Sequence, residues 1–236
     1  MPRAVPRPRR PLTPLTVVVS LVVILAVVLA GLIIRDSAAV TSWDLGILQA
    51  LSDAHTPWLD ALSLGINWLF SPVIAAVIVV VTAAIVLAVT RCLRPMVTFL
   101  TLVMIPWLGN DLIKAIVQRP RPDMSALSNS LVGTPSSLSY PSGHVAFATA
   151  YCLALLISVG GGRFRPLFTA IAVVVPLLTA FSRMYLGVHY LTDVVASLVY
   201  TTAAVVLVNA LVEWAYARVG AERVSSGTGP VPGPPQ

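Results

Sequence analysis

Three short groups of polar residues interrupt the second half of this otherwise apolar chain. The first runs from Lys114 to Pro122, the second from Tyr140 to His144 and the third from Ser182 to Asp193. Together they hold cations, two imidazoles and a carboxylate. These residue types can bind phosphate and transfer a phosphoryl group, provided that the fold brings them together.

The cations of these groups predict an anion site. Lys114, Arg121 and Arg183 would repel one another near one point unless an anion lay between them. The arginine fork matches phosphate oxygens, and lysine adds a point charge. Ser142 and Gly143 stand where a helix is expected to begin, so free backbone N–H groups can also hold an anion. Gly143 allows the backbone to approach closely.

The two histidines predict covalent chemistry at that site. His189 and Asp193 are four residues apart and therefore lie on one helix face. The carboxylate can bond one imidazole nitrogen and leave the other free to attack. His144 remains as the general acid for the leaving alkoxide. No cluster of carboxylates is available for Mg²⁺, so we expect phosphoryl transfer through a phosphohistidine, without metal or cofactor.

The elements that must position these residues are membrane-spanning helices. Of the 236 residues, 57% are hydrophobic and 10% charged, against about 25% charged in soluble domains. The sequence thus predicts an all-α fold, a polytopic membrane helix bundle with six transmembrane helices. The six stretches are Pro14–Ile34, Pro72–Thr90, Pro95–Ile113, His144–Gly161, Pro166–Leu186 and Tyr190–Tyr216.

The arginines between the stretches give the orientation. The net charge of +6 is interpreted as a topology signal, and no nucleic-acid partner is expected. With six spans, four arginine-containing segments fall on one side, which the positive-inside rule makes cytoplasmic. Both termini are then cytoplasmic, and all three polar groups reach the outer face of the plasma membrane. The arginines are Arg3, Arg7, Arg9, Arg10, Arg91, Arg94, Arg163, Arg165, Arg218 and Arg223.

This topology divides the chain into a basic cytoplasmic segment (1–13), a six-helix membrane domain (14–217) and a disordered cytoplasmic tail (218–236). The membrane domain includes an outer active-site loop (114–143) and an outer interfacial segment (36–71). In the latter, a helical apolar stripe predicts a helix lying in the interface, with Asp44 and Asp53 off the stripe. The stripe residues are Trp43, Ile47, Leu48 and Leu51.

The three groups also resemble a known signature. Lys114 to Pro122 has the pattern K-x6-R-P, Pro141 to His144 reads P-S-G-H, and Ser182 to Asp193 reads S-R-x5-H-x3-D. In this the chain is similar to the bacterial membrane branch of the type-2 phosphatidic acid phosphatase superfamily, the lipid phosphate phosphatases. The resemblance covers Leu100 to Val205, and each motif position matches.

The resemblance implies a role for each motif residue. His189 resembles the nucleophile, Asp193 its orienting partner and His144 the acid. The phosphate-binding set is then Lys114, Arg121, Ser142, Gly143 and Arg183. Members are typically metal-independent and act on phosphatidic acid, phosphatidylglycerophosphate or undecaprenyl diphosphate, so the expected partners are a phospholipid or isoprenoid phosphate substrate and membrane lipids.

Alternatives stay open at this point. A phosphotransferase would reach the same phosphohistidine and pass the phosphoryl group to an acceptor other than water. A transporter of anionic lipids would also carry intramembrane charge, but has no need of a His–Asp pair. Vanadate-binding peroxidases share these residues and resemble soluble proteins. The preferred lipid and the oligomeric state are not predicted.

Other residues near the motifs are expected to have structural roles. We expect Arg119 to extend to lipid headgroups and His55 to lie at the surface. Tyr185 and Tyr190 are expected to be interfacial anchors. Asn110 and Asp111 are expected to form polar helix–helix contacts, with support of the Lys114 side chain as the alternative.

Overall fold

The fold is helical throughout the described residues, which in this computed structural model are 13–133, 135 and 137–225, with the backbone alone for 220–225. They form eight α-helices, two 3-10 helices and no strand. The first half holds α1 (Pro14–Arg35), α2 (Ala38–Asp53), α3 (Pro57–Leu69), α4 (Pro72–Thr90) and α5 (Leu93–Val117). The second holds η1 (Met124–Ala126), α6 (Gly143–Ser158), η2 (Gly162–Phe164), α7 (Arg165–Tyr185) and α8 (Leu191–Ser225).

Local signals set many helix ends. Prolines stand in the first turns of α1, α3, α4 and α7, where the missing N–H costs no helical hydrogen bond. Thr13 and Ser37 cap α1 and α2 by accepting hydrogen bonds from backbone N–H groups. At the end of α5, Gln118 adopts the left-handed conformation that turns the chain out of the helix.

Five helices are long and apolar enough to cross a membrane: α1, α4, α5, α7 with η2, and α8. Many of their large apolar side chains are exposed, as expected of surfaces that face lipid. α6 has 16 residues and is about 24 Å long, shorter than a usual span. The predicted membrane helix bundle is thus supported by five helices, and the sixth crossing stays a prediction.

α6 nevertheless lies at the centre of the bundle, in contact with α5, α7 and α8. α4 and α6 both pack on α5, and small residues on α4 and α6 leave room for the aromatic side chains of the core. The resulting core contains Ala75, Val79, Ala83, Phe99, Leu102, Val103, Phe147, Ala150, Ala154, Val205 and Val208.

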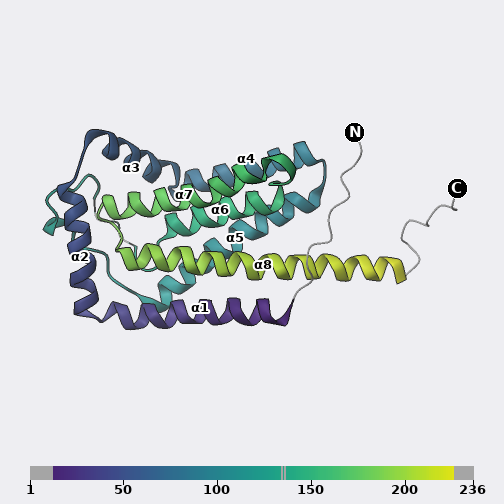
Figure 1. The fold of residues 1–236 in the computed structure, drawn as a ribbon, viewed down its shortest axis with the longest axis horizontal. Helices are drawn as coiled ribbons and strands as arrows, with labels where there is room; N and C mark the ends of the chain where they lie inside the picture. The colour runs from purple at the N-terminus through teal and green to yellow at the C-terminus, as the bar shows by residue number, and fades with distance from the viewer. Residues whose placement is uncertain (1–12, 134, 136, 226–236) are drawn as a thin grey trace.

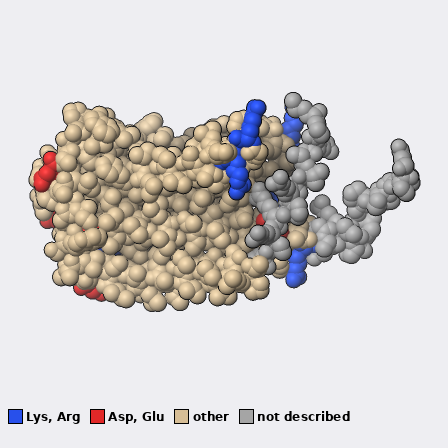
Figure 2. Space-filling view, viewed as in Figure 1, with Lys and Arg blue, Asp and Glu red and all other residues tan. Residues whose placement is uncertain are grey.

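The long helices run side by side, and α2 lies across one end of them (Figure 1). α3 follows at the same end and packs on α7. α8 extends beyond the other helices at the opposite end (Figure 1). On the face shown in Figure 2, Lys and Arg gather toward the end where α8 extends, whereas Asp and Glu lie mainly near α2.

Two predictions about the outer segment and the tail need correction. Asp44, predicted to lie off the apolar stripe, is fully buried on the same helix face as Leu48 of that stripe, because Arg119 and Thr192 bind its carboxylate inside the protein. The tail predicted to be disordered from residue 218 is helical to Ser225, since Arg218 to Ser225 contains no proline and a single glycine. Residues 1–12 and 226–236 lie outside the described residues.

Candidate active site

The three polar groups of the sequence come together at the end of the bundle that α2 crosses. Lys114 lies in the last turn of α5, and Ser142 caps the start of α6. Arg183 lies in the last turn of α7, and Asp193 lies in the first turn of α8. His189 lies in the short connection between α7 and α8, where Gly187 has a φ of 68° that few other residues adopt.

His189 is held with one ring nitrogen toward a cation and the other toward a carboxylate. Nη1 of Arg121 lies 3.1 Å from Nε2 of His189 and also donates to the Val188 carbonyl at 2.5 Å. A guanidinium can only donate, so Nε2 is the acceptor and the proton is assigned to Nδ1. Nδ1 faces Oδ2 of Asp193 at 3.5 Å, a separation longer than a good hydrogen bond.

Burial and the surrounding positive charges keep this imidazole neutral. Burial is the largest cause that lowers the pKa of His189 well below 6.5, followed by the positive charges of Arg121, Lys114 and Arg183 and by His144. The pKa of His189 is therefore lowered by all four predicted site residues that carry a positive charge or a second imidazole. The neutral form has the free lone pair that a nucleophile needs.

Asp193 is a buried carboxylate with several fixed donors. Its Oδ2 accepts from the backbone N–H of Tyr190 at 3.0 Å and from the Ser139 hydroxyl. Its Oδ1 accepts from Nη1 of Arg119 at 2.7 Å. These bonds fix the plane of the carboxylate, so that Oδ2 stays on the side of His189.

Unpartnered polar atoms mark the place where an anion would fit. Within the described residues, the Ser142 hydroxyl and Nε of Arg183 are buried and have no hydrogen-bond partner. Buried polar atoms are usually paired, so these two suit an anionic ligand beside the first N–H groups of α6. A Cβ on Gly143 would meet only Asn110 Nδ2, at 3.8 Å. Packing alone therefore does not require a glycine at this position.

The loop between α5 and α6 supplies neutral oxygens to Lys114 and Arg121 of the first group. Lys114 Nζ donates to the Leu138 carbonyl at 3.0 Å. Arg121 donates from Nε to the Ser137 carbonyl at 2.7 Å and from Nη2 to its hydroxyl at 2.8 Å. Burial lowers the pKa of Arg121 to about 10, which is still high enough for a full charge at neutral pH.

α3 contributes a residue that the motifs do not predict. Oδ1 of Asn67 accepts from Nη1 of Arg183 at 2.6 Å, and its backbone carbonyl lies 3.4 Å from Nε2 of His144. The Ser182 hydroxyl donates to the Ser63 carbonyl at 3.1 Å. Asn67 is an isolated polar residue more than 70 positions before His144, and no spacing in the sequence connects the two.

The prediction that Arg119 extends to lipid headgroups is wrong. Its side chain is 1% exposed and donates to Asp193, Thr192 and Asp44. Two buried carboxylates and a hydroxyl provide a better environment for the guanidinium than the membrane surface does. The sequence shows Asp44 and Arg119 as separate charges 75 positions apart, so their pairing could not be predicted.

Three further predictions need revision because the side chains form contacts inside the protein. Tyr185 and Tyr190 are buried and do not anchor the chain at an interface. His55 stacks on Tyr185 with ring centroids 4.2 Å apart, and its Nδ1 lies 3.2 Å from Oδ1 of Asp60. Its side chain is 9% exposed, so it is not the surface residue expected.

Asn110 and Asp111 were both predicted to form helix–helix contacts, but only Asn110 is buried. Asn110 is buried and donates to the Pro141 carbonyl at 3.5 Å, whereas Asp111 is exposed. Asn110 thus packs against the segment that leads into α6. No group of three or more metal-ligating side chains occurs among the residues that the structure describes. The absence of a metal requirement remains a prediction.

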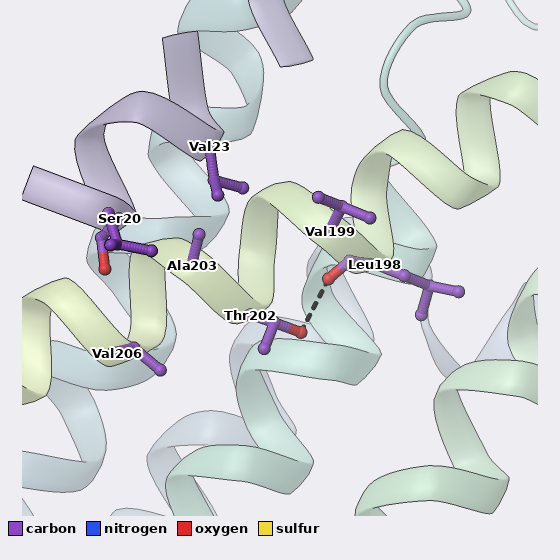
Figure 3. Close-up of a pocket in the computed structure, with 8 residues that line it drawn as sticks. Ser20, Val23, Leu198, Val199, Thr202, Ala203 and Val206 are labelled. Carbon is purple, nitrogen blue, oxygen red and sulfur yellow. Dashed lines mark hydrogen bonds between the residues drawn. The ribbon is translucent and has the colours of Figure 1, made fainter. Parts of the chain in front are cut away.

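An apolar groove between α1 and α8 is separate from this site (Figure 3). None of its lining residues belongs to the three polar groups, and the polar Thr202 bonds its own helix at the Leu198 carbonyl, at 2.7 Å. The groove is lined by Val19, Ser20, Val23, Leu198, Val199, Thr202, Ala203 and Val206.

Comparison with known families gives a match over the region that carries the polar groups. The model of the PAP2 superfamily matches residues 93–217. This range includes Lys114, Arg121, His144, Arg183 and His189. It leaves out α1 to α4, and hence Asp44 and Asn67.

Characterised relatives are named for several lipid phosphates. A decaprenylphosphoryl-5-phosphoribose phosphatase of Mycobacterium tuberculosis is 43% identical over 83 residues, and the match covers 35% of this chain and 42% of the relative. The chain thus matches less than half the length of this relative. Phosphatidylglycerophosphatase B of Bacillus subtilis is 30% identical over 168 residues, covering 66% of this chain and 76% of the relative.

A solved structure shares the fold. The crystal structure of a transmembrane PAP2-type phosphatidylglycerolphosphate phosphatase from Bacillus subtilis matches with a TM-score of 0.67 and 25% identity. The match covers 86% of this chain and 96% of that chain. The likeness therefore includes helices outside the region matched by the family model.

Proposed function

Because the chain belongs to the PAP2 superfamily, we propose that it hydrolyses a lipid phosphate or lipid diphosphate, without a metal ion, through a phosphohistidine on His189. The observation that carries this proposal is the setting of His189. Its proton-free Nε2 faces the cation Arg121, while its Nδ1 faces the buried Asp193. This arrangement suits attack on a phosphorus atom whose oxygens lie among the cations.

The proposed reaction has two steps. In the first, Nε2 of His189 attacks phosphorus and the bond from phosphorus to the lipid oxygen breaks. His144, which takes up a proton when the negative charge of the bound phosphate offsets the cations, gives that proton to the lipid oxygen. Asp193 accepts the Nδ1 proton of His189 in a hydrogen bond and stabilises the positive ring. In the second step, water loses a proton to His144 and attacks phosphorus, so that the phosphorus–nitrogen bond breaks and phosphate leaves.

Charge stabilisation is the proposed role of the remaining motif residues. Lys114, Arg121 and Arg183 would hold the phosphate oxygens, together with Ser142 and the N–H of Gly143. The buried, unpartnered Ser142 hydroxyl and Arg183 Nε support this assignment. The three cations would also stabilise the charge that spreads over the oxygens in the transition state.

The substrate class follows from the setting of the site and from the relatives' names. The helices around the site expose apolar side chains, which suits a substrate that stays in lipid while its phosphate reaches the polar end. Relatives are named for phosphatidylglycerophosphate, undecaprenyl diphosphate and a decaprenylphosphoryl sugar phosphate. The arginine-rich opposite end (Figure 2) supports an outward-facing site in the plasma membrane.

A substrate panel tests this proposal. The purified full chain in detergent, with EDTA, is given phosphatidic acid, phosphatidylglycerophosphate and undecaprenyl diphosphate, and released phosphate is measured. We expect turnover of at least one lipid, its loss in His189→Gln and its retention in the control His55→Gln. Turnover only after addition of a divalent metal, or activity preserved in His189→Gln, would contradict the mechanism.

The same reaction in ¹⁸O-labelled water separates hydrolysis from phosphotransfer. Hydrolysis places one labelled oxygen in each released phosphate, because water breaks the phosphorus–nitrogen bond. Phosphate without label, accompanied by a new phosphorylated lipid or sugar, would assign the protein as a phosphotransferase.

A further inference from the structure

We propose that Arg119, held in place by Asp44 of α2, is a positioning residue that orients Asp193 toward His189. This inference rests on the proposed function, because it concerns the partner of the nucleophile. Neither residue is among the motif positions to which a role was assigned from the sequence. Asp44 also lies outside the region matched by the family model.

The contacts of Arg119 place it behind the His–Asp pair. Nη1 donates to Oδ1 of Asp193 at 2.7 Å and to the Thr192 hydroxyl at 2.6 Å, and Nη2 donates to Oδ2 of Asp44 at 3.0 Å. Its guanidinium also lies 4.0 Å from the ring centroid of Tyr190, a cation–π distance. Because the Arg119 side chain makes these contacts and is 1% exposed, it is poorly placed to bind a substrate phosphate.

Asp44 connects this arginine to the start of α8. Oδ1 of Asp44 accepts from the backbone N–H of Thr192 at 3.2 Å, and its Oδ2 accepts from the Thr192 hydroxyl at 2.5 Å. The N–H groups in the first turn of a helix have no partner inside the helix. Asp44 therefore fastens α2 to α8 one residue before Asp193.

The orientation of Asp193 follows from this arrangement. Arg119 holds Oδ1, while the Tyr190 N–H and the Ser139 hydroxyl hold Oδ2, which faces Nδ1 of His189. Without the guanidinium, Oδ1 would lose its charged partner, and the carboxylate would be free to turn about the two bonds that remain on Oδ2. Two buried carboxylates, Asp44 and Asp193, would also lose the cation between them, and an unpaired buried charge is costly.

The charge on Arg119 also bears on the pH at which the pair works. His189 faces Arg121 from the loop after α5, Lys114 from α5, Arg183 from α7 and His144 from α6. The groups that face Asp193 are Arg119, Ser139, Tyr190, Tyr140, Lys114 and Arg121. Loss of the positive charge of Arg119 favours protonation of the pair, so the acid limb of the rate profile should move to higher pH.

Steady-state kinetics of Arg119→Gln and Arg119→Lys test the proposal, with Arg94→Gln as the matched control. Arg94 pairs with Glu213 at 2.8 Å at the opposite end of the bundle. For Arg119→Gln we expect kcat to fall about 10- to 100-fold, KM to change less than about threefold and the acid limb to move up by about one pH unit. Arg119→Lys, which keeps the charge without the fork, should recover part of kcat.

Asp44→Asn keeps the shape of the side chain and provides the second variant should Arg119→Gln fold poorly. Alone it should lower kcat, and when added to Arg119→Lys it should lower kcat by less than the product of the two single effects. Wild-type kcat and an unmoved acid limb in the arginine variants would overturn the proposal. So would a raised KM with unchanged kcat, which would make Arg119 a substrate ligand, or fully independent effects in the double variant.

The outcome for the wild type separates this inference from the proposed function. If the wild-type protein turns over lipid phosphate and Arg119→Gln has the same kcat, KM and acid limb as Arg94→Gln, the positioning role alone is refuted. A wild-type protein that releases no phosphate from any lipid of the panel refutes both.

Discussion

The cations around His189 should make the stability of the folded protein depend on pH. In the folded state the pKa of His189 lies well below 6.5, with burial as the first cause and Arg121 as the next. In the unfolded chain it is about 6.5. As the pH falls below about 6.5, the unfolded state binds a proton that the folded state does not. The free energy of unfolding therefore decreases toward acid pH.

The size of this effect follows from the same difference. Because only the unfolded chain takes up this proton, lowering the pH from 7.5 to 5 costs at most about 2 kcal/mol through this one imidazole. For a chain of this length that corresponds to a fall of about 4–8 °C in Tm. His189→Gln removes the titrating group, so this part of the pH dependence should disappear.

Thermal unfolding of wild type and His189→Gln in the same detergent at pH 7.5 and pH 5 measures the difference. Arg121→Gln is the graded comparison, because it removes one of the charges but leaves the imidazole, and it should lose only part of the effect. Equal pH dependence in wild type and His189→Gln would show that His189 does not cause it, since His144 and all carboxylates are the same in both.

Three further variants address single parts of the site. Gly143→Ala should fold normally, because the added Cβ meets only Asn110 Nδ2 at 3.8 Å. It should raise KM, because the methyl group hinders the approach of phosphate. An unchanged KM in the phosphate-release assay would argue against an anion at the start of α6. Arg183→Gln should lower kcat/KM about 10- to 150-fold through the loss of a charge-assisted hydrogen bond of about 1.5–3 kcal/mol, and less than threefold would remove it from the phosphate-binding set. Asn67→Ala should change the ratio of kcat/KM values between lipids and leave the unfolding temperature nearly unchanged, since Asn67 contacts both Arg183 and His144. An equal loss of kcat/KM for each lipid would give Asn67 a structural role only.

Local sequence patterns were sufficient for the long helices and for the approach of the three polar groups. The predicted stretch Pro72–Thr90 coincides with α4, because proline marks its start and an uninterrupted apolar run its length. Lys114, Arg183 and Asp193 lie at helix ends, so the count of helices between them placed them at one end of the bundle. These features depend on residues close together in the chain.

Local sequence patterns could not predict the contacts between residues that are far apart in the chain. Arg119 stands two residues from Arg121 and looked like another surface arginine, but Asp44, 75 positions earlier, makes it a buried residue. Asn67 reaches Arg183 across 116 positions, through the packing of α3 on α7. The direction of the Asp44 side chain depends on which face α2 turns toward α8, and its charge alone did not indicate that it shares a buried face with Leu48.

If Nε2 of His189 takes the phosphoryl group, the phosphorylated protein can be trapped and its label located. Wild-type protein is mixed with a ³²P-labelled lipid phosphate in EDTA, quenched within milliseconds in strong base and digested, and the labelled peptide is sequenced by mass spectrometry. We expect a base-stable, acid-labile phosphoryl group on His189. Label on His144 instead, or phosphate release at full rate from the His189→Gln variant, would contradict this assignment.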